Sequence, residues 1–218
     1  MKAILIILIS IIFVSCSDKD KVVYSLPSDK DINEIISTII LSDSIPVVRM
    51  EAEPDTIRVK GQPDRIIYPI RHAFSVELEK LRVYFPEPPK DTFELTPPLP
   101  SRIGVYFDDL IKRGQADNRN FFSKSDSAYF VFQNDTLNHF TISGNLLDNI
   151  YTTTKQQEES KEYTYFSCSI PVFSFDKTKA YVVLAYNCYG LCGSGNSYLL
   201  SKDNGHWIIK KRKTLWIS

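Results

Sequence analysis

The chain has 218 residues, and its 26 Lys and Arg side chains balance 26 Asp and Glu side chains, so the formal net charge at pH 7 is 0. This balance provides no positive field for a phosphate backbone, and we expect no nucleic-acid partner. Hydrophobic residues make up 43% of the chain and aromatic residues 12%. That is enough apolar surface for a folded core, which excludes a purely disordered tether.

The first residues have the pattern of a secretory signal. Lys2 is the only charged residue before an apolar run from Ile4 to Val14. This run has about half of the ~20 residues that a membrane-spanning helix needs. Charged residues from Asp18 onward prevent its extension. We therefore predict a cleaved signal peptide over residues 1–15, after which 25 basic side chains face 26 acidic ones, a net charge of −1.

The predicted signal ends in the sequence FVSC at residues 13–16, which resembles the lipobox of bacterial lipoprotein precursors. The resemblance implies that Cys16 becomes the first mature residue and carries acyl chains such as palmitate. Two or more such chains anchor a protein firmly to a bilayer. The acidic run at residues 17–20 also resembles the surface-export signal of some Gram-negative lipoproteins. We expect a lipid-anchored protein of the bacterial cell envelope, on the periplasmic or surface side of the outer membrane.

The mature chain reads as a short linker and one folded domain. Residues 16–28 are polar and without periodicity, and we predict a lipidated N-terminus and linker there. Residues 29–218 are predicted to form a single α+β domain, with a sub-division near residue 115 as the alternative. Isoleucines at helical spacing predict an amphipathic helix at its start. These are Ile32, Ile35, Ile36, Ile39 and Ile40.

Short alternating runs rich in Val, Ile, Tyr and Phe follow from Val47 onward and predict strands. The proline-rich stretch at 86–100 predicts a surface loop, and residues 106–114 predict a short helix ended by Gly114. Residues 127–142 are expected to form a strand, a turn at Asn134-Asp135 and a second strand. We further expect a short helix over 143–154, capped by Ser143, and a polar loop over 155–162.

The last fifty residues predict an antiparallel meander of four or five strands. Asn204-Gly205 fits a type I′ hairpin turn, in which both central residues need a positive φ. The predicted fold class is therefore α+β, with the amphipathic N-terminal helix packed on a mostly antiparallel sheet.

A glycine-rich stretch inside this meander carries two of the four cysteines, Cys188 and Cys192. The spacing of Cys and His lacks a zinc pattern, so we predict no metal and no cofactor. Cys192 between glycines, with His206 as a base, would suit a thiol-dependent hydrolase. Because His206 lies in the predicted hairpin turn, we assign no catalytic residue.

A disulfide is the favoured interpretation of these cysteines, since disulfides persist in exported proteins. A Cys188–Cys192 bond requires the chain to reverse between them, which Gly190 permits. A Cys168–Cys188 bond is the alternative, if the hairpin at residues 176–179 has a three-residue loop. The first pairing leaves Cys168 as a small buried hydrophobic residue.

The sequences GLCGSG, NGHW and WIS near the C-terminus resemble the tail of a group of uncharacterised exported bacterial proteins. The resemblance covers Ala180–Ser218, departs at Tyr189, where many members have glycine, and implies no activity. We expect a non-enzymatic binding or envelope-associated module for an unknown protein or small molecule. The alternatives are the hydrolase centred on Cys192 and a small-molecule pocket in a cone-shaped sheet of the NTF2 kind.

The intact mass of the protein from its native membrane tests these assignments. We expect the loss of residues 1–15 and added acyl mass at Cys16. Alkylation before reduction should modify one of the other three thiols and leave two protected. Three modified thiols would contradict the disulfide, and a mature chain without acyl mass would contradict the anchor.

Overall fold

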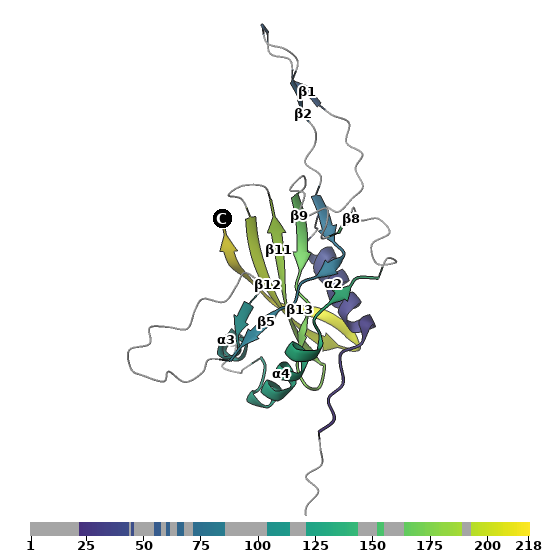
Figure 1. The fold of residues 1–218 in the computed structure, drawn as a ribbon, viewed down its shortest axis with the longest axis vertical. Coiled ribbons are helices and arrows are strands. Elements are labelled where there is room, and N and C mark those ends of the chain that lie inside the picture. The colour runs from purple at the N-terminus through teal and green to yellow at the C-terminus, as the bar shows by residue number, and fades with distance from the viewer. Residues whose placement is uncertain are drawn as a thin grey trace, which may run out of the picture.

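The computed structural model describes residues 22–43, 45, 55–57, 60–61, 65–67, 72–85, 104–113, 121–143, 152–154, 164–188 and 193–218. Helices and a mostly antiparallel sheet make up these residues, which confirms the α+β class (Figure 1). None of the helices in the described ranges is both long and apolar enough to cross a membrane. The predicted signal peptide, Cys16 and the loops at 86–100 and 155–162 lie outside the described residues.

The main sheet has seven strands in the order β13-β12-β11-β9-β3-β8, with β10 also paired to β11. Its strands are β3 (His72–Ser75), β8 (Thr152–Thr153), β9 (Thr164–Cys168), β10 (Val172–Phe173), β11 (Lys179–Asn187), β12 (Gly193–Asp203) and β13 (His206–Ile217). Among the described strands of this sheet, only the pairs that β3 makes with β8 and β9 are parallel. The predicted meander corresponds to β9 through β13 and is confirmed. The φ values of 48° at Asn204 and 85° at Gly205 confirm the predicted turn.

Short strands also form in the predicted alternating region. They are β1 (Asp55–Ile57), β2 (Arg65–Ile67), β4 (Glu77–Leu78), β5 (Arg82–Tyr84), β6 (Gly104–Tyr106) and β7 (Phe140–Thr141). They pair as β1 with β2, β4 with β7, and β5 with β6. The expected helix over 143–154 lies mostly outside the described residues, and its last part is the strand β8.

Helix α2 (Asp29–Ser42) is the predicted amphipathic helix. The Ser28 side chain caps it by accepting a hydrogen bond from the Asp31 backbone N–H at 3.1 Å. All five isoleucines of the predicted stripe are buried in one core with inward-facing residues of the sheet, among them Leu184, Tyr198 and Trp207. Each buried isoleucine contributes about 1.5 to 3 kcal/mol.

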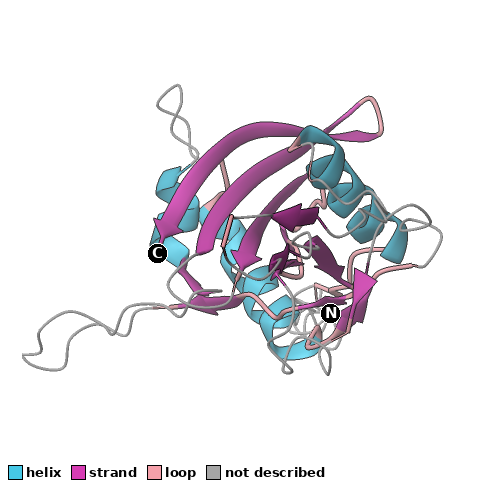
Figure 2. Cartoon of the chain, turned by 90° about the horizontal axis from the view of Figure 1, so that it is seen from above, coloured by secondary structure: helices cyan, strands magenta, loops and turns pink. Residues whose placement is uncertain are grey.

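A second core covers the other face of the same sheet. Side chains alternate along a strand, so Val182 and Leu184 join the α2 core whereas Tyr181 and Val183 join this second core. Helix α3 (Phe107–Arg113) contributes the buried Leu110 to this core and ends before Gly114, as predicted. Figure 2 shows the curved sheet with helices on both sides.

The strand and turn predicted over residues 127–136 are wrong, because this segment is the helix α4 (Ser127–Thr136). A 3-10 turn, η1 (Lys124–Asp126), precedes it, and the Ser123 backbone N–H donates to Asp126 Oδ2 at 2.8 Å. This contact favours the start of a helix. Only the end of the segment, in β7, is the predicted strand.

Tertiary contacts explain why α4 overrides its strand-like pattern. The helix buries Tyr129, Phe130 and Gln133. The Gln133 side chain donates to the Phe173 carbonyl at 2.8 Å and accepts from the Phe173 N–H at 3.2 Å. It thereby satisfies both backbone hydrogen-bonding groups of Phe173 in the short strand β10. Such contacts outweigh intrinsic preference.

The described part of the predicted linker, residues 22–28, has no helix or strand and contacts the folded domain. The Tyr24 ring lies 5.8 Å from that of Tyr129, 5.4 Å from that of Phe132 and 5.8 Å from that of Phe175. The Tyr129 hydroxyl donates to the Ser25 carbonyl at 2.8 Å. Residues 22–28 are therefore docked on the domain, because aromatic residues of α4 and of the turn before β11 hold them.

Two glycines of the predicted glycine-rich turn lie inside β12. A Cβ atom on Gly195 would come within 2.2 Å of Trp216 Nε1, and one on Gly193 within 3.2 Å of the same indole ring. Gly195 pairs with Trp216 across β12 and β13. The absence of side chains on β12 therefore makes room for the Trp216 ring.

Replacing Gly195 by alanine tests this packing. We expect Gly195→Ala to lower the free energy of unfolding by about 1 to 3 kcal/mol, because the new methyl group overlaps the indole. In a Trp216→Ala background the same change should stabilise by about 0.5 to 1 kcal/mol, since alanine costs less backbone entropy than glycine. Urea unfolding of the four variants measures both. The same sign in both backgrounds would contradict the explanation.

Candidate functional site

A hollow of about 310 Å³ opens on the sheet face that α2 covers, beyond the C-terminal end of the helix. It is lined by Asp43, Ile45, Phe166, Leu184, Tyr186, Ser194, Asn196 and Arg212. We call it the apical hollow. Its volume falls at the lower end of the range for small-molecule sites.

The length of α2 explains why the hollow exists. Fourteen residues of helix span about 21 Å, and contacts fix both ends of α2 on the sheet. Its first turn meets the end of β12, where Lys202 Nζ and Asp31 Oδ1 lie 2.5 Å apart. Its last residues reach Tyr198 and Arg212. The end of β11 and the start of β12 extend beyond the helix, so their inward side chains face the hollow.

Three polar side chains meet where α2 ends. The Tyr198 hydroxyl donates a hydrogen bond to Asp43 Oδ2, and Arg212 Nη2 lies 3.2 Å from the same oxygen. The guanidinium also lies 5.9 Å from the centre of the Tyr198 ring. The Asp43 side chain is 9% exposed and that of Arg212 is 53% exposed. The carboxylate is therefore shielded, while the cation stays accessible.

Asp43 stands at an unfavourable place for a negative charge. It is the C-cap of α2, where the helix dipole is negative. A nearly buried carboxylate there requires compensation, which the Tyr198 hydroxyl and the Arg212 guanidinium supply. Burial, and then the hydrogen bond to Asp43, raise the pKa of Tyr198 well above its usual value. This hydroxyl stays protonated at neutral pH.

The walls of the hollow are aromatic and amphipathic. The Phe166 and Tyr186 rings lie 5.0 Å apart, tilted by 43°. Asn196 Oδ1 accepts a hydrogen bond from Thr214 Oγ1 at 3.1 Å, which leaves the Nδ2 amide group as a donor. The hollow thus combines aromatic surface with an accessible cation and neutral donors.

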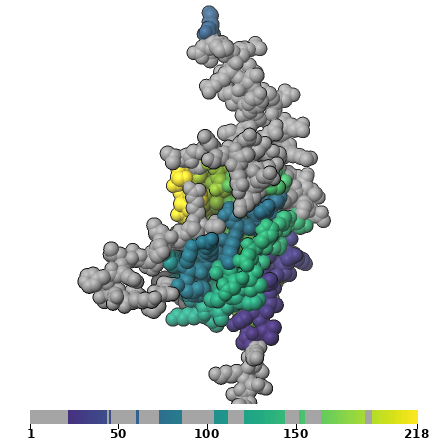
Figure 3. Space-filling model, viewed as in Figure 1, coloured from purple at the N-terminus to yellow at the C-terminus, as the bar shows by residue number. Residues whose placement is uncertain are grey.

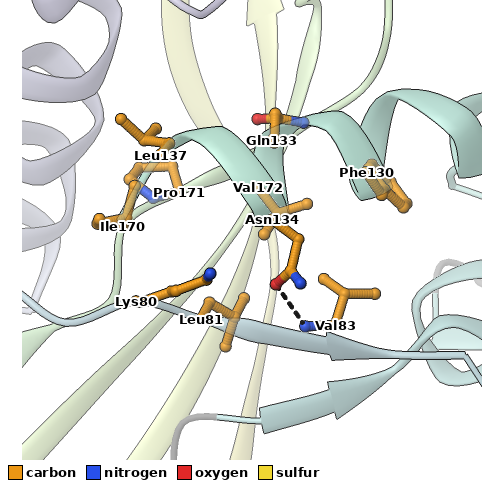
Figure 4. Close-up of a pocket in the computed structure, with 10 residues that line it drawn as sticks. All are labelled: Lys80, Leu81, Val83, Phe130, Gln133, Asn134, Leu137, Ile170, Pro171 and Val172. Atoms are coloured by element: carbon orange, nitrogen blue, oxygen red, sulfur yellow. Dashed lines mark hydrogen bonds between the residues drawn. The ribbon is translucent and has the colours of Figure 1, made fainter. Parts of the chain in front are cut away.

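A second hollow, between β5, α4 and the segment before β10, is too small for a ligand. Figure 4 shows its lining, with the Val83 backbone N–H donating to Asn134 Oδ1 at 3.3 Å. Its volume is about 20 Å³, which is room for about one water molecule. It is a packing gap between helix and sheet.

The cysteines do not gather at a reactive centre in the described residues. Cys168 is free and buried, and it pairs with Leu184 across the sheet. Cys188, the residue after β11, is disulfide-bonded. The alternative Cys168–Cys188 bond is therefore wrong. Its register failed because the hairpin turn before β11 lies between Ser174 and Lys179, so that Phe173 pairs with Ala180 and Cys168 with Leu184.

The favoured Cys188–Cys192 bond stays a prediction, since Cys192 lies outside the described residues. The register supports it. Asn187 pairs with Gly193, and a continuation of this register by one step would bring position 188 opposite position 192. Directly opposed residues of antiparallel strands have Cα atoms about 4.5 to 5.5 Å apart, which suits a disulfide.

His206 cannot serve as the base for Cys192. It opens β13 at the far end of β12 from Gly193, and eleven residues of strand span about 35 Å. Its Nδ1 atom lies 3.4 Å from Glu34 Oε1 instead. Within the described ranges, no three His, Cys, Asp or Glu side chains are grouped so that they could hold a metal ion.

The sequence analysis missed the apical hollow. In the sequence, Asp43 lies at the end of the predicted helix and shows no sign of a site. Arg212 is one of four consecutive basic residues, a pattern that indicates a solvent-exposed strand. All four are exposed on β13, the edge of the sheet. The available signal was Ser194, Asn196 and Tyr198, polar groups at alternate positions of a strand that faces a core.

The pH dependence of stability tests the Tyr198 contact. Its raised pKa means that stabilisation is full below about pH 10 and is lost at higher pH, as unfolded tyrosine ionises and the folded residue stays neutral. Tyr198→Phe should cost about 1 to 3 kcal/mol at pH 7. Between about pH 10 and 11.5 the unfolding free energy of the parent should fall as pH rises. In Tyr198→Phe this fall should be smaller by up to ~1.4 kcal/mol per pH unit.

Tyr129→Phe is a matched variant for this titration. Burial raises the pKa of Tyr129 to about 12, so its removal should also flatten the alkaline fall. Urea unfolding over this pH range measures all three proteins. A Tyr198→Phe profile parallel to that of the parent would contradict the contact.

Comparisons with known proteins find no family model, no curated protein and no solved structure that matches the chain. The lipobox and the C-terminal tail therefore stay resemblances of short motifs. The residues and the geometry of the apical hollow are what support a function for this protein.

Proposed function

We propose that the chain is a lipid-anchored, non-enzymatic binding module of the bacterial cell envelope. Its ligand is a small molecule with an apolar or aromatic body and one anionic group, which binds in the apical hollow. One observation supports this most directly. An accessible guanidinium lies on the rim of an aromatic-lined hollow of about 310 Å³.

Charge favours an anion as the polar part of the ligand. The charges of Asp43 and Arg212 cancel, but the two side chains differ in exposure. That of Asp43 is 9% exposed and that of Arg212 is 53% exposed. An incoming ligand therefore meets the cation first. Arg212 uses Nη2 toward Asp43, and a guanidinium has five N–H donors in a planar fork. Donors remain for a carboxylate, sulfonate or phosphate.

The walls favour an apolar or aromatic body. Phe166, Tyr186 and Leu184 come from neighbouring strands, and Ile45 closes the side next to α2. Aromatic faces bury large apolar areas and stack with planar ligands. Asn196 and Ser194 add neutral hydrogen-bonding groups at one side. Such a mixture of apolar walls and a few polar groups is typical of small-molecule sites.

The polar groups of the hollow suit binding better than catalysis. The Tyr198 hydroxyl is committed to Asp43, and its raised pKa makes it a poor proton donor near neutral pH. Among the described lining residues, Ser194 has no histidine or lysine beside it that could act as its base. The lining residues thus provide a fixed cation and apolar walls for binding.

The envelope part of the proposal rests on the sequence. The apolar run and the FVSC motif at residues 13–16 support an acylated Cys16. A module anchored in this way samples ligands next to a membrane. Its bilayer anchor and its hollow are independent, and each can be tested alone.

Binding of anilinonaphthalene sulfonate, an aromatic anion, tests the hollow. We expect a fluorescence increase with the parent protein and an affinity about tenfold to a hundredfold lower for Arg212→Gln, since charged hydrogen bonds contribute about 1.5 to 3 kcal/mol. Lys213→Gln is the matched control, because the next residue of β13 pairs with Ser197 and points to the opposite face. Its affinity should equal that of the parent.

Loss of Arg212 leaves Asp43 without its cation, so a second variant guards against misfolding. Asp43→Asn combined with Arg212→Gln removes both charges and keeps an amide beside Tyr198. It should bind the probe as weakly as the single variant while its circular dichroism matches the parent. Equal affinities for Arg212→Gln and Lys213→Gln would overturn the proposal.

A further inference from the structure

The docked segment over residues 22–28 carries an inference about how the domain stands on a membrane. The Tyr24 ring contacts the rings of Tyr129, Phe132 and Phe175. Lys177 Nζ donates to Ser25 Oγ at 2.6 Å, in addition to the bond from Tyr129 to the Ser25 carbonyl. We call this contact the basal dock. It lies at the end of the molecule where α4 and the turn before β11 meet (Figure 1).

We propose that the basal dock fixes the orientation of the domain on the bilayer, with the Phe175 end against the lipid headgroups and the apical hollow opening away from them. The partner of this surface is a lipid bilayer. The inference rests on the lipid anchor at Cys16 in the proposed function, but not on the ligand of the hollow.

The length of the chain before the dock carries the first step. Cys16 and Tyr24 are separated by eight residues, and a fully extended chain covers at most about 3.3 to 3.6 Å per residue, or ~28 Å in all. A flexible chain of that length has an end-to-end distance of only about 16 Å. The dock is therefore held at most ~28 Å from the bilayer surface, and on average at about 16 Å.

A free linker would act differently. If residues 16–28 were unattached, the domain would hang from Asp29 at the start of α2, and no face would be preferred. Tyr24 moves the point of attachment to the aromatic cluster of α4. Figure 3 shows the first described residues, in purple, beside the teal residues of α4 at this end.

The surface around the dock is suited to headgroups. Phe175 is 48% exposed, Leu26 38% and Val22 57%, although other aromatic side chains at the dock are packed. Exposed aromatic and aliphatic side chains enter the interfacial region readily. Lys177 lies on the same turn, and a cation near an anionic surface gains about 1 kcal/mol.

The acidic residue of this turn is bound within the turn itself. Asp176 is exposed, but its Oδ1 accepts hydrogen bonds from Ser174 Oγ at 2.6 Å, the Thr178 N–H at 3.0 Å and Thr178 Oγ1 at 2.8 Å. The neighbouring Asp126 is buried and accepts from the Phe175 N–H at 2.9 Å. Both carboxylates hold the backbone of the turn, which leaves Phe175 projecting from it.

The apical hollow lies at the other end of the sheet. Strand β11 begins at Lys179, just after the Phe175 turn, and ends at Asn187, next to Tyr186 in the wall of the hollow. Nine residues of strand span about 30 Å. A bilayer at the basal dock would leave the hollow open to solvent on the far side.

Fluorescence quenching on vesicles tests this orientation. The full-length lipidated protein is placed in vesicles of phosphatidylethanolamine and phosphatidylglycerol, in a three-to-one mixture set by the experiment, with a headgroup-attached nitroxide quencher. A bimane label is attached to Phe175→Cys or, at the far end, to Ile217→Cys, which is 79% exposed and pairs with Ser194. Cys168 is buried and Cys188 is disulfide-bonded, so neither competes for the label.

We expect the label at position 175 to lose most of its fluorescence and the label at position 217 to keep most of it. Tyr24→Ala, which removes the ring from the dock, should reduce the quenching at 175 to the level at 217. Tyr24→Phe keeps the ring and should leave quenching unchanged. Equal quenching at 175 and 217 in the parent, or an unchanged difference in Tyr24→Ala, would overturn the orientation.

Flotation of the vesicles separates this failure from that of the anchor. The parent and both Tyr24 variants should float with the vesicles, and Cys16→Ala should not. A parent that floats but shows equal quenching contradicts only the orientation. A parent that does not float contradicts the lipid anchor, and the orientation with it. Probe binding in the hollow is tested independently by Arg212→Gln.

Discussion

The packing of the α2 isoleucine stripe on one face of the curved sheet is the contact on which the rest of the structure depends. It places both ends of one helix. At the start, Ser28 caps the helix, and the chain before it continues directly into the dock at Tyr24. At the end, Asp43 is brought against Tyr198 and Arg212. A longer helix would fill the apical hollow, and a shorter one would leave Asp43 in solvent.

The sheet serves two cores at once because its strands alternate. Odd-numbered residues of β11, such as Tyr181 and Val183, support α3 and the β5–β6 layer, and even-numbered ones, such as Val182 and Leu184, support α2. Both layers are apolar near the start of β11. Toward its end, the α2 face turns to Tyr186 and the polar residues of β12. This change from a packed core to a lined hollow occurs within one strand, at the place where the helix stops.

The charges at the end of α2 are not an obvious source of stability. A carboxylate at the negative end of a helix dipole, nearly buried, costs desolvation that its partners only offset. Apolar side chains would fill the same place at less cost. The arrangement is reasonable if the half-exposed guanidinium of Arg212 binds a ligand and Asp43 holds that guanidinium in position. The basal dock at Tyr24, in contrast, is apolar and aromatic, as a permanent attachment should be.

The sequence alone determined the features that depend on neighbouring residues. The α2 stripe, the meander and the turn at Asn204-Gly205 all follow from local spacing. Only the tertiary structure decided what depends on distant partners. Residues 127–136 look like a strand, but contacts with β10 make them a helix. The register of the β12–β13 pairing could not be predicted from the sequence either. An irregularity in the β12–β13 pairing at Leu199/Leu200 places Arg212 opposite Tyr198. A regular ladder from the turn would place Lys211 there, because each extra residue in one strand moves the following side chains to the other face.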